Sequence, residues 1–172
     1  MALGRRRDFV QRWLEKARKA EDPFDRFFYA WIALVAAAQR QRTQTGIPFR
    51  EIYADREKVL EYFAAKRSNV LQVLKDNRQR LHKLACRKGA RFAKPVIDTR
   101  SLRLRGIFSD FSAHYTHRMP MTEEQLVEAT GEVINKIRIN LFQGTSDDSE
   151  DIELLELVNP ILLQILESCE SR

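Results

Sequence analysis

Residues 122–144 read TEEQLVEATGEVINKIRINLFQG, and this stretch predicts one long helix. Thr122, with Gln125 three residues later, matches a capping box, in which the two side chains satisfy backbone N–H groups at a helix start. Apolar residues then recur every three or four positions as far as Leu141, which is the spacing of one helical face. Gly144 is well placed to follow the last turn, because glycine readily adopts the left-handed conformation found there. The stretch therefore predicts a helix with a defined start and end.

Helical periodicity also covers most of the remaining chain. Asp22 before Pro23 is typical of a helix start, and the wide apolar stripe that follows predicts a buried helix. Pro160 is expected to kink the last helix or to begin a new helical piece. Two further helices are expected at residues 8–20 and 23–42, and the last at 149–168. Between them, one helix is expected to begin at residue 55 and to break near residues 68–69, where another begins and continues through residue 84. No alternating strand-like run stands out, so we expect an all-α bundle of about five to six helices.

The chain of 172 residues is long enough to bury a core, and we expect residues 1–172 to form a single domain. The segment from residue 90 to 120 shows no clean period and contains Pro95, Gly106 and Pro120. We expect this segment to be a loop-rich basic insertion between helices, with one or two short helices of its own.

Composition is typical of a soluble globular protein, with 44% hydrophobic and 31% charged residues. The longest apolar stretch, residues 27–38, is shorter than the roughly 20 residues that span a bilayer. No apolar run follows the arginines near the N-terminus, so no secretory signal is expected. Cys86 and Cys169 lack the spacing of a disulfide framework or a zinc site. We therefore expect a cytoplasmic protein without membrane association.

Charge is unevenly distributed along the sequence. Residues 1–120 carry a net charge of +15, and residues 121–172 carry −9. A basic body suggests a polyanionic partner such as nucleic acid. The alternative is that the two parts neutralise each other, either within the fold or across a dimer.

The motifs of most common enzyme classes are missing. The sequence has no glycine-rich phosphate loop, nucleophile elbow, His-Glu-x-x-His pattern or paired-cysteine motif. His114 and His117 are three residues apart, but no third ligand lies near them in the sequence to complete a metal site. We therefore expect no metal ion and no cofactor.

Two segments resemble the HEPN family of helical RNA- and nucleotide-handling domains. The first is RINLFQG at residues 138–144, followed by an acidic run ending in Asp151 and by a leucine-rich helix; the family's comparable segment typically reads Arg-x-Asn-x-Phe-His-Gly. The second is DPFDRFFYAWIA at residues 22–33, which is similar to the family's early helix with its Asp-Pro start and Trp-Ile-Ala core. Together the two segments frame nearly the whole chain.

The resemblance implies a helical bundle that forms a homodimer through its C-terminal helices, so that two copies of the motif meet in a cleft. In active relatives this cleft cuts RNA without a metal ion. Arg138 would bind the phosphate with its planar fork of donors, and Asn140 would orient groups by hydrogen bonds. The family's histidine would move a proton, but its position is Gln143 here.

Gln143 is a serious departure, because an amide has no proton to exchange near neutral pH. Three explanations remain open. The protein is a natural non-catalytic binder, or it is an inactivated form of an active enzyme, or His114 or His117 replaces the missing group. A purely structural interpretation also exists, in which Lys136 and Arg138 interact favourably with the dipole at the helix C-terminus.

We therefore predict an RNA-binding, ribonuclease-type HEPN protein of a prokaryotic defence, toxin–antitoxin or CRISPR-linked system, with metal-independent endoribonuclease activity that is impaired or lost. The alternative is a non-enzymatic interaction subunit or antitoxin-like binder whose basic body contacts nucleic acid or a protein partner. The predicted catalytic positions are Arg138, Asn140 and Gln143. The predicted RNA-contacting residues are Arg138, Lys136, Arg78, Lys83, Arg87, Arg103 and Arg105.

Overall fold

The computed structural model describes residues 2–46, 55–86, 99–116, 119–142 and 148–171, with the backbone alone for residues 2–7, 99–105 and 148. Every regular element in these ranges is an α-helix, which confirms the prediction of an all-α fold. The helices are α1 (Ala2–Lys19), α2 (Pro23–Gln44), α3 (Asp55–Ala65), α4 (Arg67–Asp76), α5 (Arg78–Cys86), α6 (Thr99–Tyr115), α7 (Glu123–Phe142) and α8 (Asp148–Glu170).

The described ranges contain eight helices, so the prediction of five to six was wrong. One cause is Asn77, which separates α4 from α5 where a single helix was expected. Its side chain, 2% exposed, donates to the carbonyl oxygen of Val73 at 2.9 Å and to Oε1 of Gln164 at 2.6 Å. A side chain that bonds to the backbone in this way competes with helix continuation.

The segment at 90–120 also differs from the expected loop-rich insertion, because most of its described part is the 17-residue helix α6. Phe108, Phe111 and Tyr115 are buried and occur at helical spacing. This helical spacing was not recognised in the sequence, because it covers only three aromatic residues and follows Gly106 and several arginines. Residues 87–98 and 117–118 lie outside the described ranges.

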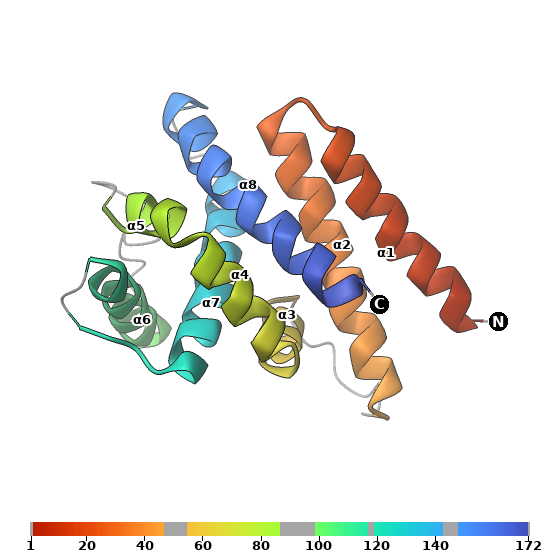
Figure 1. The fold of residues 1–172 in the computed structure, drawn as a ribbon, viewed down its shortest axis with the longest axis horizontal. Helices are drawn as coiled ribbons and strands as arrows, with labels where there is room; N and C mark the ends of the chain where they lie inside the picture. The colour runs from red at the N-terminus through yellow and green to blue at the C-terminus, as the bar shows by residue number, and fades with distance from the viewer. Residues whose placement is uncertain (1, 47–54, 87–98, 117–118, 143–147, 172) are drawn as a thin grey trace.

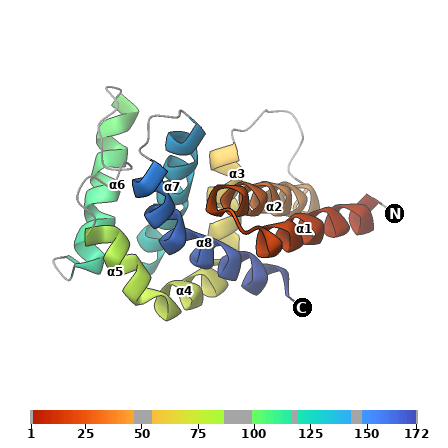
Figure 2. The same cartoon turned by 90° about the horizontal axis from the view of Figure 1, so that it is seen from above.

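The helices form a bundle in which α8 crosses the face of α2 (Figure 1). The first two helices form an antiparallel pair, and α7 lies between that pair and α6 in both views (Figures 1 and 2). The short helix α5 packs on α6 and α8, while α3 packs on α7. Gly131 allows this last contact, since a Cβ there would lie 2.6 Å from Cδ2 of Leu60.

Local signals at helix starts are confirmed. The Asp22 carboxylate accepts hydrogen bonds from the N–H groups of Phe24 and Asp25 at 2.8 and 3.0 Å. The Thr122–Gln125 capping box forms in both directions, at 3.1 and 3.2 Å. The last helix continues as one element through Pro160.

Ion pairs join the basic body to the acidic C-terminal part. Four of the seven ion pairs among the described residues connect residues before 121 with residues after it. These four are Arg18–Glu167, Arg40–Glu170, Arg56–Glu132 and Arg67–Glu123. Part of the charge asymmetry is therefore neutralised within the fold.

Across the described ranges, no helix is both long and apolar enough to cross a bilayer. The two cysteines lie in different environments: Cys86 is exposed, and Cys169 is buried in α8. Burial raises the pKa of the Cys169 thiol to about 11.

At pH 8, a thiol with that pKa is only about 0.1% thiolate, the form that reacts with disulfide reagents. We therefore expect Ellman's reagent to label one thiol per native chain, at Cys86, and both thiols after unfolding in guanidinium. Cys86→Ser should remove the native signal. Rapid labelling of two thiols in the native protein would contradict the buried position of Cys169.

Candidate nucleic-acid interface

Arg138 lies one turn before the end of α7, where aromatic rings hold its guanidinium. The guanidinium carbon lies 4.9 Å from the ring centroid of Trp31 in α2 and 5.8 Å from that of Phe142. Its Nη2 donates to Oδ1 of Asn135 at 3.2 Å. Cation–π contacts and one hydrogen bond therefore fix the orientation of a half-buried arginine.

The Nε atom of Arg138 is buried and has no hydrogen-bond partner among the described residues. An unpaired buried donor is unfavourable, so an acceptor that reached it would be stabilised. The guanidinium can donate from five N–H groups in a fork that matches phosphate oxygens. The Arg138 guanidinium is thus held in one orientation and still has unused hydrogen-bond donors, which suits an arginine that binds an anion.

An exposed aromatic side chain lies next to this arginine. Phe142, the last residue of α7, is 61% exposed and packs edge-on against Phe28, with ring centroids 4.7 Å apart. Ile152, near the start of α8, is 38% exposed. An exposed aromatic ring such as that of Phe142 can stack on an RNA base.

Asn140, the other predicted motif residue within the described ranges, lies on a different face of α7 from Arg138. Lys136 and Asn140 are half-buried and lie four residues apart, so they share one face of α7. Arg138 lies two residues from each and therefore projects from a different face. Gln143 lies outside the described residues. The observed partners of Arg138 are Asn135, Trp31 and Phe142, which the sequence analysis did not assign to the site.

Four of the other predicted RNA-contacting residues belong to α5 and α6, which lie on the other side of α7 from α2 (Figure 2). Arg78 and Lys83 are exposed on α5, a helix that contains no acidic residue. Arg103 and Arg105 belong to the neighbouring helix α6, of which only the backbone is described there, and Arg87 lies outside the described ranges. The predicted residues with described side chains thus lie in two separate places, on α7 with Arg138 and on α5 with Arg78 and Lys83. We call the second of these, with the neighbouring α6, the basic α5–α6 surface.

His114 does not replace the missing histidine of the motif. Its Nδ1 accepts a hydrogen bond from the N–H of Met121 at 3.0 Å, just before α7 begins. Arg138 lies 15 residues beyond the first residue of α7, a distance of roughly 22 Å along the helix. His117 is outside the described residues, and within those ranges no three metal-binding side chains cluster.

No protein-family model, curated protein or solved structure matches this chain. The resemblance to the HEPN family is carried by residues 22–33 and 138–144 alone and stays a prediction.

Proposed function

We propose that the protein is a HEPN-like RNA-binding domain of ribonuclease type whose cleavage is impaired because Gln143 stands at the histidine position of the motif. The observation that supports it best is the oriented guanidinium of Arg138, held against Trp31 beside the exposed ring of Phe142. In this proposal Arg138 binds a phosphate, and Phe142 stacks on a base or on a partner subunit. Asn140 and Gln143 orient the RNA by hydrogen bonds.

The proposed homodimer places two copies of this cluster in one cleft. Its support is the exposed apolar surface of Phe142 and Ile152, at the end of α7 and the start of α8. Pairing there would cover both side chains and bring the two arginines near one RNA strand. A prokaryotic defence, toxin–antitoxin or CRISPR-linked role follows from the family resemblance.

RNA binding with the motif variant Arg138→Ala tests the proposal. We expect its affinity for a single-stranded RNA to fall about tenfold, because a charge-assisted hydrogen bond is lost. The slope of log affinity against log salt should decrease by about 1, since one phosphate contact disappears. Fluorescence anisotropy at several salt concentrations measures both quantities.

Arg67→Ala is the matched control, because Arg67 is exposed on α4 and carries the same charge. Its affinity should stay within twofold of the wild type. Arg138→Lys keeps the charge but loses the planar fork, so it should recover only part of the affinity. Equal affinities of Arg138→Ala and the wild type would contradict the proposed role of the motif.

A second candidate is a non-enzymatic binder that uses the basic α5–α6 surface. It is favoured by the position of α5 and α6, which lie on the other side of α7 from α2, the helix whose Trp31 contacts Arg138 (Figure 2). Binding that falls steeply with salt, is unaffected by Arg138→Ala and is weakened by Lys83→Gln would support this candidate over the first.

A further inference from the structure

The first helix, α1, lies at the edge of the bundle and packs mainly on α2 (Figures 1 and 2). Val10, Leu14 and Ala17 form its buried face. Phe9 and Trp13 lie beside that face, and Phe9 is 40% exposed while Trp13 is half-buried. The helix therefore presents two aromatic rings at the molecular surface.

Three aromatic side chains from α1 and α2 form a row at this edge. The ring centroids of Phe9 and Trp13 are 6.0 Å apart, and those of Trp13 and Tyr29 are 5.6 Å apart. Tyr29 belongs to α2 and is half-buried. Asp25 is exposed one turn before it on the same helix. These contacts hold the three rings side by side across the helix pair.

Two exposed cations share this side of α1. Arg12 and Lys16 follow Phe9 by three and seven residues, which is the spacing of one helix side. Nζ of Lys16 lies 4.2 Å from the ring centroid of Trp13, within the range of a cation–π contact. Asp8 lies one turn before Arg12, yet neither cation has an ion-pair partner among the described residues. The α1–α2 aromatic surface is defined by Phe9, Arg12, Trp13, Lys16 and Tyr29.

The other described cations of α1 are already paired. Nε of Arg18 lies 2.7 Å from a carboxylate oxygen of Glu167, and Nζ of Lys19 lies 2.9 Å from one of Glu15. The helix as a whole has seven basic and two acidic residues, a net charge of +5. The cations of α1 that remain available to an anion, among those with described side chains, are therefore the two beside the aromatic row.

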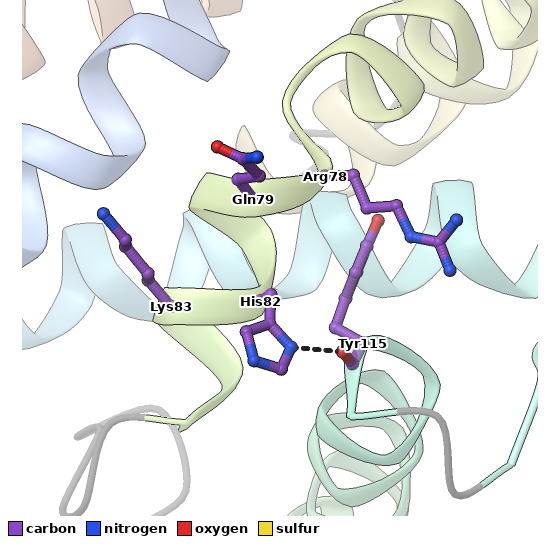
Figure 3. Close-up of a pocket in the computed structure, with 5 residues that line it drawn as sticks. All are labelled: Arg78, Gln79, His82, Lys83 and Tyr115. Atoms are coloured by element: carbon purple, nitrogen blue, oxygen red, sulfur yellow. Dashed lines mark hydrogen bonds between the residues drawn. The ribbon is translucent and has the colours of Figure 1, made fainter.

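The pocket between α5 and the end of α6 does not combine these groups in the same way (Figure 3). Basic side chains line it, but its aromatic residue, Tyr115, is only 5% exposed. In Figure 3 Lys83 points away from Tyr115 and from Arg78. The α1–α2 aromatic surface differs because its rings and cations lie together at the surface.

The aromatic row lies close to the proposed phosphate site along α2. Tyr29 directly follows Phe28 in the sequence, and both are half-buried. The ring of Phe28 packs against that of Phe142 with centroids 4.7 Å apart, and Phe142 lies beside Arg138. Consecutive residues of α2 therefore contact the aromatic row on one side and the surroundings of Arg138 on the other.

Rings interleaved with unpaired cations suit single-stranded nucleic acid. Its bases stack on aromatic side chains, and basic side chains contact the phosphates between them. A duplex keeps its bases paired and stacked inside, so it cannot offer them to a protein surface. A lipid bilayer is a poorer fit, because Trp13 and Tyr29 are half-buried and do not protrude as membrane-inserted side chains do.

We infer that the α1–α2 aromatic surface binds the bases of a single-stranded RNA segment, with Arg12 and Lys16 at its phosphates. The inference rests on the proposed function, because it assigns a second part of the same RNA strand to this surface. It also specifies the RNA, since a strand whose bases are unpaired is required.

Tryptophan fluorescence tests the surface directly, because the chain contains two tryptophans and Trp31→Phe leaves Trp13 as the single emitter. We expect a ten-nucleotide uridine RNA to cause a saturable loss of Trp13 emission, since a base in the aromatic row quenches the indole. A strand of the same length without bases should leave the emission unchanged. Unchanged Trp13 emission at saturating uridine RNA would overturn the inference.

Phe9→Leu separates stacking from apolar packing, because leucine keeps an apolar side chain and removes the ring. Its affinity for the uridine RNA should fall about tenfold, and its affinity for the strand without bases should stay within about twofold. Met119→Ala is the control, since Met119 is an exposed apolar residue just before α7, and it should change neither affinity. Fluorescence anisotropy measures both, and circular dichroism checks that each variant is folded. Equal affinities of Phe9→Leu and the wild type for the uridine RNA would contradict stacking.

Lys16→Gln tests the phosphate contact. The slope of log affinity against log salt should decrease by about 0.7, the value for one phosphate of a single strand. Lys19→Gln is the matched control, because it removes the same charge from the same helix at a residue that is paired with Glu15. Its slope should equal that of the wild type. A slope in Lys16→Gln that equals the wild-type slope would overturn the assignment of this cation.

Failure of the inference can be distinguished from failure of the proposed function. If Arg138→Ala weakens RNA binding but RNA never quenches Trp13, the inference alone is wrong. If RNA quenches Trp13 and Arg138→Ala has no effect, the proposed role of the motif alone is wrong. No RNA binding at low salt would overturn both. A shift of Trp13 emission to shorter wavelength with phosphatidylserine vesicles, without quenching by RNA, would overturn the inference in favour of a lipid surface.

Discussion

Gln143→His is expected to increase the rate of RNA cleavage by about 10²- to 10⁴-fold, the usual contribution of a positioned general acid or base. The substitution supplies an imidazole that exchanges a proton near neutral pH, which the glutamine amide does not do. Arg138 is already oriented by Trp31 and Phe142, so the proposed phosphate site needs no further change. A fluorescently labelled RNA, followed on a denaturing gel, measures the rate.

Three comparisons make this prediction specific. Gln143→Ala should cleave no faster than the wild type, because alanine supplies no proton donor. Arg138→Ala in the Gln143→His background should lose the gained activity, while Arg67→Ala should keep it. Cleavage should persist in excess chelator, as expected for a metal-independent reaction. If Gln143→His cleaves no faster than the wild type yet all variants bind RNA, the non-enzymatic binder is the better description.

Local signals predicted the starts of α2 and α7 correctly, because their physical cause lies within three residues. Asp22 bonds to the N–H groups of Phe24 and Asp25, and Thr122 bonds reciprocally with Gln125. A capping side chain and its partner are adjacent in the sequence, so their spacing alone reveals them. The all-α class follows from the same short-range periodicity.

The break between α4 and α5 and the surroundings of Arg138 depend on contacts between residues that are far apart in the sequence. Asn77 ends α4 while bonding to Gln164, a residue 87 positions away. Trp31 contacts Arg138 although more than a hundred residues separate them in the sequence. No pattern within α7 predicts this aromatic partner. By contrast, Asn135 and Phe142 lie three residues before and four after Arg138, so helical spacing could have identified them. The motif letters therefore predicted Arg138 but not the residues that orient it.

Arg56→Ala is expected to lower the free energy of unfolding by about 2 to 3 kcal/mol. Both carboxylate oxygens of Glu132 accept hydrogen bonds from Arg56, with Nε at 2.9 Å from Oε2. The Glu132 side chain is only 1% exposed, so losing Arg56 leaves a buried charge without its partner. A fully buried pair would cost about 3 to 5 kcal/mol, but the Arg56 side is 36% exposed and water replaces part of the lost contact. Urea unfolding followed by circular dichroism measures the change.

The exposed pair between α4 and α7 provides the matched control for this effect. In Arg67–Glu123 the side chains are 49% and 69% exposed, so Arg67→Ala should cost less than about 1 kcal/mol. The double variant Arg56→Met, Glu132→Leu should recover most of the stability lost in Arg56→Ala, because it removes the buried charge together with its partner. A similar loss in Arg56→Ala and Arg67→Ala would show that Glu132 is hydrated, contrary to its burial between α3 and α7. Because Glu132 and Arg138 lie on the same helix, this pair also holds in place the element that carries the proposed RNA site.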